Sequence, residues 1–96
     1  MAALPTSIRL EIVTPEKMLV REDVDEVVVP GEEGYLGVLP GHTPLLSTLK
    51  DGDLWYRKGT EKTHVPISGG FVEVLPDRVT ILAEAPAATA ADAPRS

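Results

Sequence analysis

The sequence predicts an all-β fold class: a flattened antiparallel β-sandwich or barrel of about eight to ten short strands, followed by a disordered tail. Short runs rich in valine, leucine and isoleucine recur at close spacing, and turn residues separate them. Several runs alternate apolar and polar residues, as a strand with one buried face does. Aromatic residues make up only 4% of the 96 residues, so valine, leucine and isoleucine must fill the core. The 43% hydrophobic fraction is ordinary for one globular domain, and the sequence has no internal repeat.

The first strand is expected over residues 8–13, where apolar and charged residues alternate until a Thr-Pro pair breaks the run. The next stretch, 16–29, has two interpretations. A threonine followed by a proline resembles a helix start, and several valines would share one helical face. Five of the ten residues over 20–29 are valine, and β-branching favours strands. We therefore expect two strands, over 17–22 and 24–29, and keep a helix as the alternative.

Segment 30–46 is the densest in turn residues, and we expect it to hold two tight turns around a short strand. It contains four of the eight glycines and three of the nine prolines. Glycine tolerates backbone angles that other residues avoid, and proline fixes one angle and removes a donor. The segment places Glu32 and Glu33 on one turn and His42 on the other. The residues assigned to structural turns are Pro30, Gly31, Pro40, Gly41 and Pro44, together with Ser68, Gly69 and Gly70 further along the chain.

The second half of the chain is expected to add two hairpins. Pro66 cannot donate to a strand ladder, so it should lie at an edge, a bulge or a strand end. Trp55 and Phe71 are expected in the core, and a role as interface anchors is the alternative. The expected strands cover 45–49, 54–57, 63–67, 71–75 and 78–82, with turns at 50–53, 58–62 and 76–77 and a flexible kink at 68–70.

The composition divides the chain into one β-sandwich domain, 1–84, and an alanine- and proline-rich tail, 85–96, which we expect to be poorly ordered. Residues 1–6 are expected to form an arm. They have no basic region followed by a long apolar run, so no signal peptide is expected. No apolar run is longer than four residues, so nothing is expected to span a bilayer, and membrane contact should come only through partners.

The reactive residues do not form a recognisable catalytic or metal site. Cysteine is absent, which excludes disulfides and thiolate chemistry. His42 and His64 lack the spacing of a zinc site, and the adjacent Glu32 and Glu33 are expected to point apart. The net charge of −6 disfavours nucleic acid and anionic lipid. We expect no catalytic residue, metal or cofactor, and favour a binding or structural module. The alternative is a small hydrolase with a cleft that holds His42 or His64 beside a carboxylate.

Residues 31–46, GEEGYLGVLPGHTPLL, resemble the signature EG-x-LG-x-x-PGH-x-PLL of the epsilon subunit of F-type ATP synthases. Residues 67–74, ISGGFVEV, are similar to a second signature of that family, and residues 10–16, LEIVTPE, to its usual start. The resemblance covers about 7–84. It implies a flattened β-sandwich of about ten strands at the foot of the rotor's central stalk. It also implies a non-catalytic role, docking the gamma subunit to the ring of c subunits and transmitting torque for proton-driven ATP synthesis.

The resemblance further implies which residues contact partners. The loop 30–37 matches the ring-facing loop of the family, and the turn that holds His42 lies at the same interface. Ring loops in this family usually carry a basic residue, which Glu32 and Glu33 would meet. Tyr35 stands where many relatives carry a carboxylate, so packing is expected there instead. The residues expected to contact the c ring are Glu32, Glu33, Gly34, Tyr35, Gly37 and His42.

Relatives in that family usually continue past the sandwich into a two-helix hairpin, which this sequence does not contain. We therefore expect neither hairpin-based inhibition nor an ATP site. The implied location is peripheral, on the cytoplasmic face of a bacterial inner membrane or the equivalent face of another energy-transducing membrane. The alternative function is a stand-alone β-sandwich module that binds a different protein through 30–46.

Overall fold

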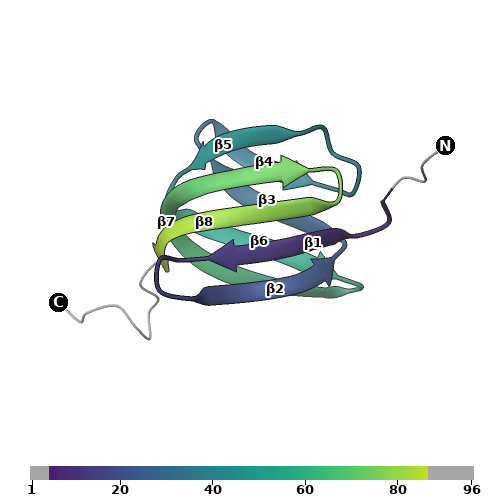
Figure 1. The fold of residues 1–96 in the computed structure, drawn as a ribbon, viewed down its shortest axis with the longest axis horizontal. Coiled ribbons are helices and arrows are strands. Elements are labelled where there is room, and N and C mark those ends of the chain that lie inside the picture. Colours follow the sequence, from purple (N-terminus) through teal and green to yellow (C-terminus); the bar gives the residue numbers. More distant parts are fainter. Residues whose placement is uncertain (1–4, 87–96) are drawn as a thin grey trace.

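A computed structural model describes residues 5–86, which form eight β-strands and no helix (Figure 1). The expected all-β fold is confirmed. The strands are β1 (Ile8–Val13), β2 (Met18–Val24), β3 (Glu26–Gly31), β4 (Gly34–Val38), β5 (Leu45–Leu49), β6 (Gly52–Lys58), β7 (Glu61–Leu75) and β8 (Arg78–Pro86). The predicted boundary at 84 falls inside β8, and residues 87–96 of the predicted tail lie outside the described residues.

The eight strands form one hydrogen-bonded sheet that folds back on itself into two layers. The front layer in Figure 1 has the order β2-β1-β8-β7-β5, and the back layer contains β4, β3, β6 and the first half of β7. The 15-residue strand β7 belongs to both layers. Its first half pairs with β6 as far as Ile67, and its second half pairs with β5 from Gly70 onward. The kink expected at 68–70 therefore lies inside one continuous strand, where that strand changes layers.

A parallel pair departs from the expected antiparallel pattern. β1 runs parallel to β8, with Arg9 opposite Arg78 and Val13 opposite Leu82. Strands joined by a short turn must be antiparallel, whereas β1 and β8 are separated by most of the chain. The direction of this pair was thus not set by any local turn. The purple β1 and the yellow-green β8 lie side by side in Figure 1.

The strand interpretation of residues 16–29 is confirmed, and the helical alternative is wrong. Residues of β2 pair with β1 from Ile8 opposite Val24 to Val13 opposite Met18, with an irregularity after Ile12. The following strand, β3, pairs with β4, β5 and β6. Valines of β3 alternate inward and outward, which suits β-branched side chains on a pleated sheet.

The core lies between the two layers and consists mainly of aliphatic side chains. Each fully buried Val, Leu or Ile side chain contributes about 1.5–3 kcal/mol relative to exposure. Tyr56 is the aromatic side chain in this core. The buried hydrophobic residues are Ile8, Leu10, Ile12, Val24, Val27, Val29, Val38, Leu49, Leu54, Tyr56, Ile67, Val72, Val74, Val79, Ile81 and Ala83.

The expectation that Trp55 and Phe71 lie in the core is wrong for Phe71 and only half met for Trp55. Phe71 is 50% exposed, because its neighbour Val72 points inward and successive strand residues face opposite sides. Trp55 is half-buried between the inward-facing residues Leu54 and Tyr56. The large size of these two side chains did not change the alternation of inward and outward residues along their strands.

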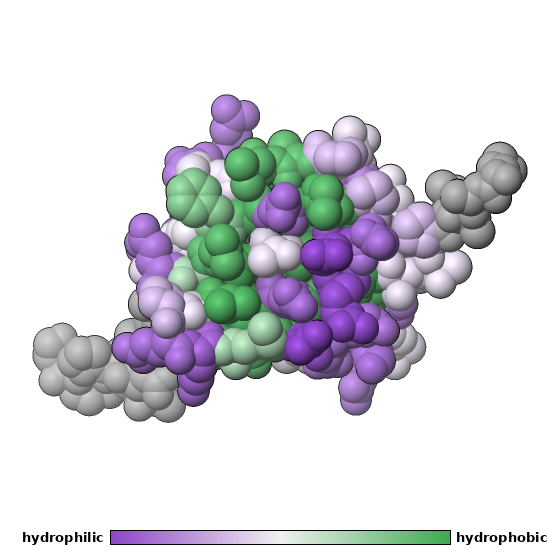
Figure 2. All heavy atoms as spheres, in the orientation of Figure 1, coloured by the Kyte–Doolittle hydropathy of each residue, from purple (hydrophilic) through white to green (hydrophobic). Residues whose placement is uncertain are grey.

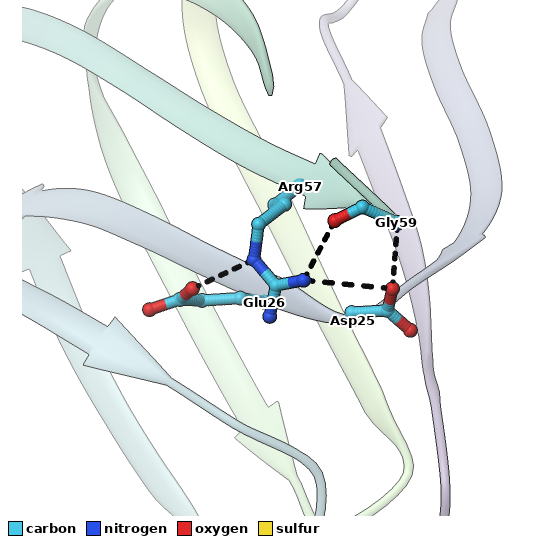
Figure 3. Close-up of polar contacts among 4 residues, drawn as sticks. All are labelled: Asp25, Glu26, Arg57 and Gly59. Carbon is cyan, nitrogen blue, oxygen red and sulfur yellow. Dashed lines mark hydrogen bonds and ion pairs between the residues drawn. The ribbon is translucent and has the colours of Figure 1, made fainter. Parts of the chain in front are cut away.

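A polar network ties the β6–β7 turn to the start of β3 (Figure 3). The Arg57 Nε atom lies 3.1 Å from Glu26 Oε1, and its Nη1 lies 3.8 Å from Asp25 Oδ2. The same guanidinium donates to the Gly59 carbonyl at 2.8 Å, and the Gly59 N–H donates to Asp25 Oδ2 at 2.7 Å. This network fixes the end of β3 opposite to segment 30–46.

Candidate functional site

The candidate site is built on the hairpin of β3 and β4. Gly31 pairs with Gly34, so Glu32 and Glu33 form a two-residue turn between the strands. Gly34 has a φ of 133°, which favours glycine, and a Cβ on Gly31 would lie 2.9 Å from the Gly34 carbonyl oxygen. The two glycines therefore allow the tight turn that projects both carboxylates from the end of the sandwich.

The two carboxylates at this tip are exposed and have no cation of their own chain. No ion pair found within residues 5–86 includes Glu32 or Glu33. The backbone of the turn is fixed to β5, since the Glu32 N–H donates to the Thr48 carbonyl at 3.3 Å and Lys50 N–H donates to the Pro30 carbonyl at 2.9 Å. The tip thus presents negative charge from a backbone that hydrogen bonds to β5 and Lys50 hold in place.

Tyr35 lies beside the tip and leans over the outer face of the back layer. It is 61% exposed, and its position in the ladder is opposite Pro30. The Asp53 N–H donates to its hydroxyl oxygen at 3.4 Å, and a Cβ on Gly52 would lie 3.2 Å from that oxygen. The ring is thereby tethered at its polar end to the start of β6 while its body stays accessible.

The structure separates His42 from the acidic tip. β4 runs from the tip to Val38, and the turn that follows places His42 beyond the far end of that strand. At about 3.3 Å per residue, β4 alone spans roughly 13 Å from Gly34 to Val38. The His42 N–H donates to the Leu39 carbonyl at 3.2 Å, and the Gly41 N–H donates to the Pro76 carbonyl at 2.7 Å. His42 therefore belongs to a turn that is anchored on the β7–β8 hairpin.

A groove opens between β4 and β5, next to the tip. It has a volume of about 550 Å³. Its apolar lining comes from Leu36, Leu45 and Leu46, and Glu32 and Glu33 stand at its acidic end. Leu46 is 71% exposed and Leu45 is 37% exposed, so the groove has an accessible apolar wall. The turn residues of segment 30–46 predicted the tip, whereas the groove has one signal in the sequence, the Leu-Leu pair after Pro44.

A second polar cluster lies on the outer face of β6 and β7. The Nδ1 atom of His64 lies 2.6 Å from Asp53 Oδ2, and the Nζ atom of Lys62 lies 4.2 Å from the centroid of the Trp55 ring. The His64 and Asp53 side chains are 55% and 49% exposed. This cluster forms an open strand surface, and within residues 5–86 the hydrogen bond of His64 is to a carboxylate, not to a nucleophilic hydroxyl. The hydrolase alternative expected a histidine beside a carboxylate within a cleft. His64 and Asp53 supply that pair, but on an exposed strand surface.

The outer face of the front layer is divided into an apolar part and a charged part (Figure 2). Phe71, Leu82 and Met18 are 50%, 52% and 45% exposed on this side. The charged part is an ion-pair ladder, with Arg9 Nε 2.7 Å from Asp23 Oδ1 and Arg21 Nε 3.5 Å from Glu11 Oε2. The hydrogen bond to the Asp23 carboxylate raises the pKa of the Arg9 guanidinium. The ladder keeps both charges of each pair close together on an exposed sheet.

The described residues contain neither a metal-binding cluster nor a membrane-spanning helix. No group of three or more His, Asp or Glu side chains there could hold a metal ion. Likewise, residues 5–86 contain no helix that is long and apolar enough to cross a membrane.

Comparison with known proteins gives consistent matches. A family model described as "ATP synthase, Delta/Epsilon chain, beta-sandwich domain" matches residues 7–88. The ATP synthase epsilon chain of Syntrophobacter fumaroxidans is 62% identical over 78 residues, covering 81% of this chain and 58% of the relative. The epsilon chain of Solibacter usitatus is 54% identical over 81 residues, covering 84% and 60%. The chain thus spans about 60% of the length of these relatives.

Solved structures show the same fold. A chain of the Euglena gracilis mitochondrial ATP synthase, in a structure of its OSCP, F1 and c-ring parts, aligns with a TM-score of 0.82 and 30% identity, covering 88% of this chain and 54% of that one. A chain of the Tetrahymena thermophila mitochondrial ATP synthase, from its central stalk and c-ring, aligns with a TM-score of 0.71 and 20% identity, covering 86% and 67%. At that identity the Tetrahymena match supports the fold alone.

Proposed function

Because the chain belongs to the β-sandwich family of ATP synthase delta and epsilon chains, we propose that it is a non-catalytic subunit of the rotor's central stalk. In this role it docks the gamma subunit to the ring of c subunits and transmits torque for proton-driven ATP synthesis. The relatives are named ATP synthase epsilon chains, and the Euglena chain with the same fold belongs to an assembly that contains a c-ring.

The observation that carries the proposal is the acidic tip. Glu32 and Glu33 project from a turn that β5 holds in place, and no cation within residues 5–86 pairs with them. A fixed and uncompensated pair of charges at the end of a rigid hairpin suits a docking contact with a basic partner. Exposed pairs contribute only about 0.2–1 kcal/mol each, so they give orientation more than affinity.

The proposed ring contact consists of the tip and its flank. Glu32, Glu33 and Gly34 would face the polar loops of the c ring, with Tyr35 packing beside them. Gly37 lies farther along β4, and His42 lies past its end. β4 places His42 well away from the two carboxylates. We therefore propose that His42 lies at the outer margin of the same interface.

This role places the chain at the periphery of an energy-transducing membrane, held there by its partners. In a bacterium that position is the cytoplasmic face of the inner membrane. The proposal needs no ATP site and no cofactor in residues 5–86.

Mixing experiments test the proposal. Purified chain, together with gamma subunit and c ring of the same organism, should form a stalk–ring complex that elutes as one species in size-exclusion chromatography. A stand-alone binding module would instead remain a monomer with no affinity for gamma. Failure of the folded chain to bind both partners would contradict the proposed function.

A further inference from the structure

The acidic tip stands on a hairpin whose outer strand has few supports. β4 is the last strand in the sheet order, and its backbone pairs only with β3. Two backbone hydrogen bonds to segment 48–50 hold the β3 side of the tip, at Pro30 and Glu32. Two-stranded ribbons twist more strongly than larger sheets. The direction in which the tip points therefore depends on what else holds β4.

Tyr35 supplies this further support with its side chain. Its ladder partner on β3 is Pro30, and its hydroxyl reaches across β3 to the start of β6, where it accepts from the Asp53 N–H at 3.4 Å. Among the hydrogen bonds found in residues 5–86, this one alone joins β4 to a strand other than β3. The side chain thus links the outer strand of the hairpin to β6.

The ladder between β3 and β6 stops short of this contact. Its last pair is Val28 with Trp55. Two residues farther along β3, Pro30 has no N–H, and its carbonyl accepts from the β5–β6 turn. The Asp53 N–H lies two residues beyond Trp55 and finds its acceptor in the Tyr35 hydroxyl. The tyrosine therefore continues the connection of the hairpin to β6 where the backbone ladder ends.

Gly52 leaves the space in which this contact is seated. A Cβ on Gly52 would lie 2.9 Å from Pro30 Cβ and 3.2 Å from the Tyr35 hydroxyl oxygen. Gly52 has no positive φ, so the packing, and not the backbone angle, requires a residue without a side chain. Pro30 is buried, two residues before Glu32. The base of the tip is thus held between Gly52 and Tyr35.

The anchor on β6 is itself fixed by β7. Asp53 Oδ2 lies 2.6 Å from His64 Nδ1, and the Asp53 backbone lies opposite Pro66 in the β6–β7 ladder. The polar cluster on the outer face of β6 and β7, which has no part in the proposed ring contact, therefore supports the residue to which Tyr35 is bonded.

We propose that Tyr35 and Gly52 are positioning residues that set the direction of the acidic tip for docking on the c ring. Tyr35 acts as a strap from β4 to β6, and Gly52 provides the seat for Pro30. A docking contact made of exposed charges gives orientation more than affinity, so it depends on where Glu32 and Glu33 point. This inference rests on the proposed function, in which the tip faces the ring.

Residual dipolar couplings of the isolated chain measure the direction of the tip. They give the orientation of the Glu32 and Glu33 N–H bonds relative to the core strands. Tyr35→Phe removes the hydroxyl and keeps the aromatic body, and Gly52→Ala pushes a Cβ against Pro30. Both variants should change the tip couplings beyond experimental error, while the couplings of β1 and β8 stay the same. Unchanged tip couplings in either variant would overturn the inference.

Gly59→Ala is the control for a loss of stability alone. It strains the β6–β7 turn through a φ of 62°, with nothing within 4 Å of the added Cβ, at the end of β6 away from the tip. Its tip couplings and its ring affinity should equal those of the wild type. A change of the tip couplings as large as that in Gly52→Ala would attribute the effect to destabilisation and overturn the inference.

Affinity for the isolated c ring tests whether the positioning acts through the carboxylates. With the wild-type tip, Gly52→Ala should weaken ring binding about threefold. In the background Glu32→Gln with Glu33→Gln, the tip has no charge to direct, and the same change should alter ring binding by less than about 1.5-fold. Equal losses in both backgrounds would show a general structural effect and overturn the inference. Absence of any ring binding by the folded wild-type chain would overturn the proposed function and the docking role with it, whereas the couplings would still decide whether Tyr35 and Gly52 direct the tip.

Discussion

No ion pair found within residues 5–86 includes Glu32 or Glu33, the two carboxylates of the β3–β4 turn. By contrast, Glu26 and Asp25 share Arg57, and Asp23 pairs with Arg9. Charges that are satisfied within the chain fix its own turns. Charges left open at a rigid tip are available to a partner.

Reversing the tip charge should weaken ring binding selectively. The double substitution Glu32→Lys and Glu33→Lys is expected to lower affinity for the isolated c ring about tenfold, because two favourable rim contacts become repulsive. Affinity for gamma should change by less than about threefold. Surface-immobilised ring and gamma, titrated with each variant, measure the two affinities separately.

The control for this reversal changes the same charge elsewhere. Glu16→Lys with Glu61→Lys also takes the net charge from −6 to −2, since each change adds two positive charges. Both residues are exposed, and Glu61 lies at the end of β6 and β7 that faces away from the tip. Equal loss of ring binding by both double variants would attribute the effect to net charge and refute the tip assignment.

Gly70 is the residue on which the layer change of β7 depends. Its φ is 118°, and an added Cβ would lie 2.1 Å from the Leu82 carbonyl oxygen. Gly70→Ala should therefore lower the free energy of unfolding by about 2–4 kcal/mol, through strain and a backbone clash. Gly59→Ala is the matched control, because Gly59 has a φ of 62° with nothing within 4 Å, and should cost about 1 kcal/mol. Urea denaturation measures both, and equal losses would show that φ alone matters at Gly70.

At the scale of single elements, strand positions followed from the sequence because burial alternates with a two-residue period. The alternation in 8–13 placed Ile8, Leu10 and Ile12 in the core, where each is fully buried. The valines of 24–29 predicted a strand for the same reason. The direction of each strand and its pairing partners were harder to predict from the sequence. Nothing local in β1 or β8 encodes that they run parallel, and the layer change at Gly70 depends on contacts with distant residues.

The candidate site, like the strand pairing, could be predicted only in part from the sequence. The density of glycine and proline in 30–46 predicted two turns around one strand, and the structure has them around β4. Whether the two turns meet depends on the length and straightness of that strand. β4 separates His42 from the tip, and the groove arises only because β5 diverges from it. The glycine and proline content of a segment predicts its turns, but it does not show which segments lie close together in the fold.

Tyr56 on β6 makes a prediction about pH. Burial raises the pKa of its phenol above the ordinary value near 10, and its hydroxyl donates to Glu22 Oε2 at 3.3 Å. A pKa that is higher in the folded than in the unfolded chain stabilises the fold below about pH 10, and this contribution is lost as the pH rises toward the folded value. The free energy of unfolding should thus fall above about pH 10, and Tyr56→Phe should reduce that slope. Urea titrations from pH 8 to pH 11 measure it, and identical slopes in both proteins would contradict the assignment.

At the scale of the whole molecule, β7 makes the two layers one body. It pairs with β6 in the back layer and with β5 and β8 in the front layer, so neither layer can open without disturbing it. The transmission of torque proposed above requires such a body, because a sandwich whose layers opened independently would yield under load. The fold therefore predicts cooperative opening.

Native-state hydrogen exchange can test this coupling through Ile67. This side chain is fully buried on β7, just before the strand changes layers. Ile67→Val should lower the opening free energy by about 0.5–1.5 kcal/mol. If the layers open together, the loss should be the same at the Val29 amide of the back layer and at the Ile12 and Ile81 amides of the front layer. A loss confined to the back layer would show that the layers open separately, and a rigid coupling element would then require bound partners to hold it together.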